Sequence, residues 1–195
     1  MTMVHSEDRE WTADHAPIIT LFNEYYGSGM NTVVFQEMRE ARGLAYSASA
    51  YYVSPRNKYD RENWMTYIVT QNDKMPDCIN HFNEILNNMP ASEGAFNIAK
   101  DALMKRLASE RAVKYGVLGN YLSSKKRGLD YDINQKLYND VPNITLQDLV
   151  NFERDLMANK TLRYVILGDE KELDKPFLEK IGTIKRVSTE TIFGF

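Results

Sequence analysis

Arg39 and Tyr46, seven positions apart in the stretch "SGMNTVVFQEMREARGLAYSASAYY" (28–52), are the side chains best suited to chemistry in this sequence. A guanidinium offers a planar fork of donors and a phenol offers a hydroxyl, and together these groups suit a peptide carbonyl or a carboxylate. On a helical wheel that starts at Phe35, both Arg39 and Arg42 flank the apolar face. A guanidinium in that position needs a partner, because burying it alone costs free energy.

Two interpretations of this stretch remain open from the residues alone. The two-residue alternation of a strand places Tyr46 on one face with Ala48 and Tyr52. Gly43 folds that strand back beside its helix, so Arg39 and Tyr46 can converge on one point. The alternative is an internal Arg–Glu ion pair beside a core tyrosine.

The other catalytic residue types do not form a recognisable site. The three histidines, His5, His15 and His81, have no histidine partner at helical spacing. "HFNEI" begins like the zinc motif H-x-x-E-H, but Ile85 stands where the second ligand must be, so we expect no zinc here and a partly exposed helix histidine. No G-x-S-x-G serine turn occurs. The single cysteine, Cys78, has no base beside it on its predicted helix.

Three further motifs have simpler structural explanations. "GSG" (27–29) lacks the lysine of a phosphate-binding loop and is interpreted as a turn. "KKRG" (125–128) fits the cationic last turn of a helix before a glycine stop. The glycosylation patterns at Asn143 and Asn159 overlap a helix cap at Thr145 and a strand start.

The elements that must position these residues follow from apolar periodicity and turn signals. We predict a first helix over 14–26 and a second over 32–42, capped by Asn31 and stopped by Gly43. Strands over 44–53 and 64–71 form an antiparallel pair. Further helices are predicted at 75–88, 93–112, 115–127, 133–138 and 146–158, then a buried strand at 161–169, a helix at 175–180 and a strand at 183–187. The clearest apolar stripe, on the helix over 93–112, combines Ala95, Ile98, Ala99, Ala102, Leu103 and Leu107.

This order predicts an α+β fold, a mainly antiparallel sheet with helices packed on one face. The 195 residues suit a single domain over 1–195. A net charge of −3 argues against nucleic acid as a partner, and no apolar run approaches the ~18 residues of a membrane helix. We therefore expect a soluble chain, and the sequence leaves its compartment open.

The segment "GSGMNTVVFQEMREARGLAYSASA" resembles the second half of the pitrilysin/insulinase-type zinc peptidases, which include the mitochondrial processing peptidases. The order of elements through "LRYVILGD" is similar over nearly the whole chain. In that family two homologous halves form a clamshell, and the first half carries the zinc motif. The second half lends an arginine and, seven residues later, a tyrosine to the active site. Arg39 and Tyr46 stand at this spacing.

The resemblance implies a zinc-free half that is inactive alone. Its site residues would be Arg39 and Tyr46, which bind substrate, and it would wall the chamber of a zinc metalloendopeptidase. Zinc is expected on the partner half, in the same polypeptide or a separate subunit, with a peptide as substrate. "LFNEYY" (21–26) would be a decayed zinc helix with Leu21 and Tyr25 at the ligand positions. The chain would be a fragment of a longer peptidase that lacks its first strand, retains a piece at 2–4, and leaves a sheet edge unpaired.

Two rival hypotheses stay open beside this one. The first is a peptide-binding or structural module of the same fold that takes no part in catalysis. The second is an independent hydrolase, which would act without a partner.

Overall fold

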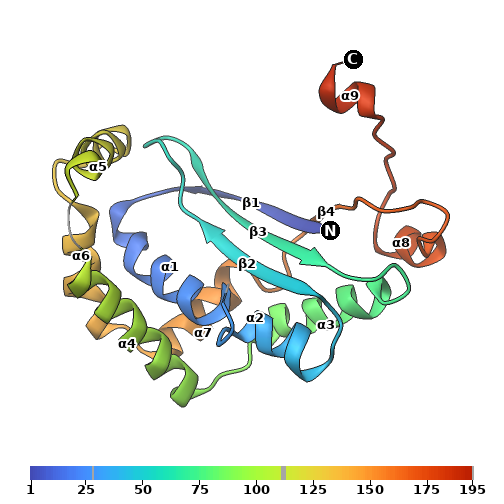
Figure 1. Ribbon diagram of the computed structural model, residues 1–195, viewed down its shortest axis with the longest axis horizontal. Helices are drawn as coiled ribbons and strands as arrows, with labels where there is room; N and C mark the ends of the chain where they lie inside the picture. Colours follow the sequence, from blue (N-terminus) through green and yellow to red (C-terminus); the bar gives the residue numbers. More distant parts are fainter. Residues whose placement is uncertain (28, 111–112, 195) are drawn as a thin grey trace.

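The computed structural model describes residues 1–27, 29–110 and 113–194, and it confirms the α+β class (Figure 1). Within these residues, four strands form one antiparallel sheet in the order β2-β3-β1-β4. The strands are β1 (Thr2–Glu10), β2 (Ser47–Val53), β3 (Arg61–Val69) and β4 (Arg163–Val165).

The helices gather mainly on one face of this sheet (Figure 1). The first half of the chain contains η1 (Ala13–His15), α1 (Ala16–Phe22), η2 (Asn23–Gly27), α2 (Val33–Phe35), η3 (Gln36–Ala41), α3 (Met75–Asn87) and α4 (Glu93–Ser109). The second half contains α5 (Lys114–Lys126), α6 (Ile133–Asp140), η4 (Val141–Asn143), α7 (Leu146–Leu156), α8 (Lys175–Ile181) and α9 (Thr189–Phe193).

The core lies between the sheet and these helices. Strand β3 shows the alternation of a half-buried strand, since Glu62, Trp64, Thr66 and Ile68 point inward while their neighbours are exposed or partly exposed. The Trp64 ring packs on Phe82 of α3 with ring centroids 6.0 Å apart. Large side chains from α1, β2 and α7 meet in the same layer, where burying each one stabilises the fold by about 1.5–3 kcal/mol. These are Phe22, Tyr52 and Phe152.

The expectation that the chain lacks a strand before its first helix is wrong. Nine residues, Thr2–Glu10, form β1, which pairs with β3 on one side and β4 on the other. The polar sequence hid this strand, because even one of its buried positions is occupied by an acid, Glu7.

Most of the helix predictions are confirmed, with caps at the expected places. The Ser92 side chain accepts a hydrogen bond from the Ala95 amide at the start of α4, and Thr145 and Asp148 form a capping box at the start of α7. The second helix begins after Thr32 rather than Asn31. The predicted end of α4 at Ala112 lies outside the described residues.

Three details of the predicted elements are wrong. Ile98 is 60% exposed and Ala102 is also exposed, so neither belongs to the buried stripe of α4, which consists of Phe96, Ala99 and Leu103. The predicted buried strand over 161–169 shortens to β4 at the edge of the sheet, and Leu167 just after it is exposed. Residues 183–187 form no strand.

The outer edge of β2 is covered by the chain itself. The Asn23 side chain donates to the Tyr52 carbonyl at 2.9 Å and accepts from the Tyr52 amide at 2.8 Å. One turn later Gly27 lies so close to β2 that an added Cβ would stand 2.5 Å from the Ala50 carbonyl oxygen. The π-helical turn η2 therefore sits directly on the backbone of this strand.

Candidate functional site

The loop over 42–46 connects η3 to β2 and is fixed by backbone hydrogen bonds. Gly43 adopts φ +57° and its amide donates to the Arg39 carbonyl at 3.0 Å, so the predicted left-handed stop is confirmed. The amides of Leu44 and Ala45 both donate back to the Met38 carbonyl. The helix end and the loop thus form one hydrogen-bonded unit.

The same loop is also tied to β3 and α3. The Tyr46 amide donates to the Val69 carbonyl at 2.8 Å. The Thr70 hydroxyl donates to the Leu44 carbonyl at 2.6 Å, and the Lys74 ammonium donates to the Gly43 carbonyl at 3.2 Å. The backbone that carries Tyr46 is therefore held in place from two neighbouring elements.

Arg39 and Tyr46 lie together on the surface, at the end of η3 and the start of β2. The guanidinium carbon of Arg39 is 5.0 Å from the centre of the Phe35 ring and 5.7 Å from the centre of the Tyr46 ring. Tyr46 is 78% exposed, and the Arg39 side chain is 46% exposed. Contact with two aromatic rings restricts the guanidinium and leaves part of its donor fork facing solvent.

This geometry decides part of the choice that the sequence left open. Arg39 does form an internal ion pair, with Nε 3.7 Å from Oε1 of Glu40, but Tyr46 is not a core tyrosine. The sequence analysis placed Tyr46 in the strand, where alternate residues point inward. In the structure β2 starts at Ser47, and the inward-pointing residues begin with Ala48. What the pair can do chemically is donate several hydrogen bonds to one acceptor at the surface.

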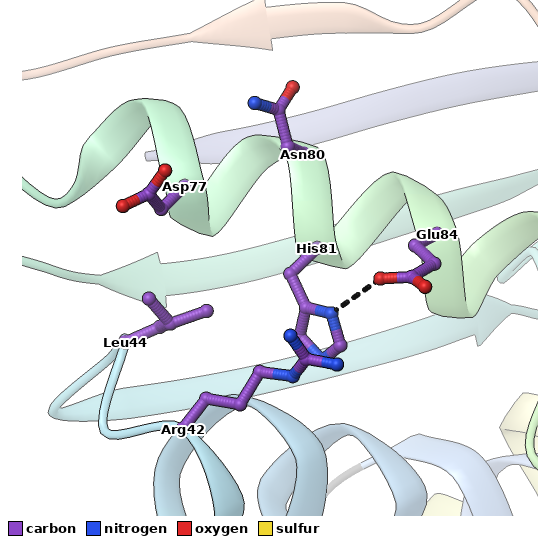
Figure 2. Close-up of a pocket in the computed structure, with 6 residues that line it drawn as sticks. All are labelled: Arg42, Leu44, Asp77, Asn80, His81 and Glu84. Carbon is purple, nitrogen blue, oxygen red and sulfur yellow. Dashed lines mark hydrogen bonds and ion pairs between the residues drawn. The ribbon is translucent and has the colours of Figure 1, made fainter.

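A second polar site lies behind this loop, between η3 and α3. An open pocket of about 610 Å³ lies there. Figure 2 shows the side chains that line it, which are Arg42, Leu44, Asp77, Asn80, His81 and Glu84. The His81 Nδ1 atom lies 2.9 Å from Oε2 of Glu84 on the same helix. Its Nε2 atom lies 3.4 Å from Oε2 of Glu37 on η3.

The prediction that His81 is partly exposed is wrong, because this side chain is 94% buried, with a relative exposure of 6%. Glu84 is visible in the sequence as a neighbour at i+3. Glu37 is not, since η3 and α3 are brought together by the tertiary fold. Sequence reasoning therefore missed that this histidine sits between two carboxylates.

A buried carboxylate, Glu62, is the centre of a separate polar cluster that the sequence did not reveal. It accepts hydrogen bonds from Arg9 Nε and the Tyr52 hydroxyl, both at 2.8 Å, and its other oxygen lies 2.7 Å from His15 Nδ1. Burial, with Glu62 beside it, raises the pKa of the Tyr52 phenol. The sequence does carry a signal for this cluster. Glu62 is an acidic residue at an inward-facing position of β3, whose residues alternate between buried and more exposed.

The remaining candidates are structural. His5 bonds the Thr161 carbonyl at 2.8 Å and lies near Glu7. Burial raises the pKa of the Cys78 thiol to about 11, so little thiolate exists at neutral pH. Ser28, at the centre of "GSG", lies outside the described residues.

The positions of the proposed decayed zinc helix belong to the core. Leu21 and Tyr25 are buried, and the Tyr25 hydroxyl donates to the Pro90 carbonyl at 2.8 Å. Glu24 forms an ion pair with Arg106 at 2.8 Å. Across the described ranges, no group of three or more His, Cys, Asp and Glu side chains could hold a metal ion. In the same residues, no helix is long and apolar enough to cross a membrane.

Comparison with known proteins gives one family match. The family described as the peptidase M16 inactive domain matches residues 5–103, about half of the chain and the part that contains both sites. No curated protein matches.

Several solved structures share the fold. A peptidase M16 inactive domain from Pseudomonas fluorescens is 19% identical with a TM-score of 0.62, and the match covers 79% of this chain and 36% of that one. An inactive peptidase domain from Bordetella parapertussis is 11% identical with a TM-score of 0.65, covering 87% and 93%. A protease from Helicobacter pylori is 13% identical with a TM-score of 0.57, covering 79% and 37%. The chain thus spans little more than a third of the first and third of these proteins.

Proposed function

Because this chain belongs to the family of peptidase M16 inactive domains, we propose that it is the zinc-free domain of a zinc metalloendopeptidase, contributing substrate binding and a chamber wall to an active site on another half. The zinc-bearing partner would be a homologous half, in the same polypeptide or in a separate subunit. Zinc on that half would act as Lewis acid and activate the attacking water.

The observation that carries this proposal is the exposed Arg39–Tyr46 pair. The Arg39 guanidinium carbon lies 5.7 Å from the centre of the Tyr46 ring, and the loop backbone is held by hydrogen bonds to Val69 of β3 and to Lys74 at the start of α3. Preorganised donors of this kind bind a peptide carbonyl and stabilise the negative charge that grows on its oxygen during hydrolysis. Tyr46 would donate its hydroxyl proton as a hydrogen bond, and Arg39 would add positive charge beside it.

The experiment is peptide hydrolysis by the assembled peptidase, comparing the natural protein with Tyr46→Phe. Loss of one such donor lowers kcat by about 100-fold in comparable sites. Tyr59→Phe is the matched control, because Tyr59 is 75% exposed and its ring also carries a cation, Lys58 at 5.4 Å, but it lies on the hairpin between β2 and β3. This chain alone, assayed with and without added zinc, should hydrolyse nothing.

Two outcomes would contradict the proposal. Unchanged turnover in Tyr46→Phe, with a zinc-loaded partner, would favour the alternative of a peptide-binding or structural module that takes no part in catalysis. Metal-dependent hydrolysis by this chain alone would make it an independent hydrolase.

A further inference from the structure

The face of the sheet that points away from the main helical layer carries apolar side chains (Figure 1). The stretch "WMTYIV" (64–69) of β3 is apolar at every position except Thr66, and Thr66 points inward. The outward residues are Met65, Tyr67 and Val69, which are 38%, 54% and 38% exposed. An antiparallel strand with one face in water normally alternates apolar and polar residues, whereas a strand covered on both faces is a continuous apolar run. The sequence of β3 is therefore typical of a strand that is covered on both faces.

Strand β2 supplies the other half of this open face. Side chains alternate across a strand, so every second residue of β2, beginning with Ser47, points the same way as Met65 and Tyr67 of β3. Small and aromatic hydroxyl side chains follow β2, and mainly apolar side chains follow β3. We call the six residues the open-face strip, which consists of three pairs that face each other across the two strands: Ser47 and Val69, Ser49 and Tyr67, Tyr51 and Met65.

The open-face strip begins where the Arg39–Tyr46 pair lies. Tyr46 directly precedes Ser47, and its amide donates to the Val69 carbonyl at 2.8 Å. From Ser47 to Tyr51 the strip extends for about 13 Å, at ~3.3 Å per residue of a strand. This length corresponds to about five residues of an extended peptide. A peptide bound at Tyr46 can therefore continue along the strip without a turn.

The chemistry of the strip fits an extended peptide with uncharged side chains. The serine hydroxyls on β2 can donate to peptide carbonyls and accept from peptide amides. Methionine adapts its shape to different apolar partners, and tyrosine supplies a large rigid contact surface at a low cost in conformational entropy. All six side chains of the strip are uncharged, so a charged side chain of the peptide placed on it would lose hydration without gaining a counter-charge.

We propose that the open-face strip binds about five residues of the substrate next to the peptide bond held at Arg39 and Tyr46, and that it selects apolar side chains there. The assignment to a substrate rests on the proposed function. The affinity of the strip for an apolar peptide is a property of this chain alone and is measured without catalysis.

The test is fluorescence anisotropy of a labelled peptide in which Leu alternates with Gln, titrated with this chain. A peptide with Glu in place of each Leu should bind at least about tenfold more weakly. Tyr67→Thr keeps a residue of high strand propensity and should weaken binding of the Leu peptide about tenfold, the effect of losing one large contact residue. Tyr138→Thr is the matched control, because Tyr138 is 51% exposed but lies on α6, and it should leave the affinity unchanged. Met65→Gln gives the same measurement if Tyr67→Thr does not fold.

Three results would overturn this assignment. The first is no binding of the Leu peptide by the natural chain, and the second is unchanged affinity in both Tyr67→Thr and Met65→Gln. The third is a dimer in sedimentation that Tyr67→Thr dissociates, which would assign the strip to a second copy of this chain. The proposed function is tested by turnover in Tyr46→Phe, so peptide binding and catalysis can fail independently.

Discussion

The Arg9 Nε atom donates a 2.8 Å hydrogen bond to Oε2 of Glu62, although the two residues lie 53 positions apart. The Glu62 side chain is 0% exposed. Its charge is tolerated in the core because Arg9, Tyr52 and His15 all contact the carboxylate. The cluster ties β1, β2, β3 and η1 together at one end of the sheet.

Replacing Glu62 with alanine should destabilise the fold by about 3 kcal/mol. The loss arises because the Tyr52 hydroxyl keeps its buried position without an acceptor and Arg9 loses its counter-charge. Urea unfolding followed by circular dichroism measures the difference. Glu10→Ala, at the exposed end of β1, should change stability by less than about 0.5 kcal/mol. Equal effects of the two substitutions would contradict a stabilising role for the cluster.

Glu153 on α7 makes stability depend on pH. This side chain is 2% exposed, and burial raises the pKa of its carboxyl to about 7, above the 4.5 of a free glutamate. As the pH rises, the unfolded chain loses the Glu153 proton before the folded chain does. The contribution of the protonated Glu153 carboxyl to stability is therefore complete below about pH 4.5 and declines as the pH rises to about 7.

Glu153→Gln should therefore raise the free energy of unfolding at pH 8 by about 2 kcal/mol and leave it nearly unchanged at pH 4.5. Urea titrations of both proteins at the two pH values give this difference. Glu179→Gln on the exposed face of α8 is the control and should show no such dependence. A gain that is the same at both pH values would show that Glu153 does not titrate in this range.

Gly27→Ala should destabilise the fold by about 2 kcal/mol, because the new methyl group would overlap the Ala50 carbonyl oxygen and push η2 away from β2. Gly119→Ala offers the opposite case within α5, where an added Cβ meets nothing within 4 Å. That change should stabilise the helix by about 0.5–1 kcal/mol. Denaturant midpoints of the two variants should lie on either side of the natural value. A neutral Gly27→Ala would mean that η2 and β2 can separate at little cost.

Arg39→Lys in the assembled peptidase should raise KM for peptides about tenfold. Lysine keeps the positive charge but lacks the planar donor fork, which lies against the Phe35 and Tyr46 rings. Steady-state kinetics give KM and kcat separately. Arg106→Lys is the control, since Arg106 lies on α4 and pairs with Glu24 of η2, outside the Arg39–Tyr46 pair. An unchanged KM would remove Arg39 from the substrate-binding surface.

The sequence predicted the helical layer well because α3, α4 and α7 bury one face each, and α4 and α7 carry caps that can be recognised locally. It failed where burial depends on a neighbour that is distant in sequence. Strand β1 is polar, and its place between β3 and β4 depends on pairing from both sides. Conversely, the apolar residues over 183–187 suggested a strand, but strand propensity without a neighbouring strand is insufficient.

The candidate site shows the same division. Arg39, Gly43 and Tyr46 were identified from spacing and residue type, and the structure places Arg39 beside Tyr46. The exposure of Tyr46 was missed, because the backbone hydrogen bonds from Leu44 and Ala45 to Met38 delay the start of β2. The contact between Glu37 and His81 joins two helices that no local pattern relates.

The side-chain amide of Asn23 binds the backbone of Tyr52, so the β2 edge of the sheet is partly occupied by the chain itself. A free strand margin is the usual template on which another chain adds a strand. On β2 the Asn23 side chain already occupies the backbone hydrogen-bonding groups of Tyr52. A strand that paired with β2 at this residue would first have to displace η2. Among the described strands, β4 is the opposite margin and has a neighbour on one side. The obstruction stands at the far end of β2 from Tyr46, which immediately precedes the first residue of that strand.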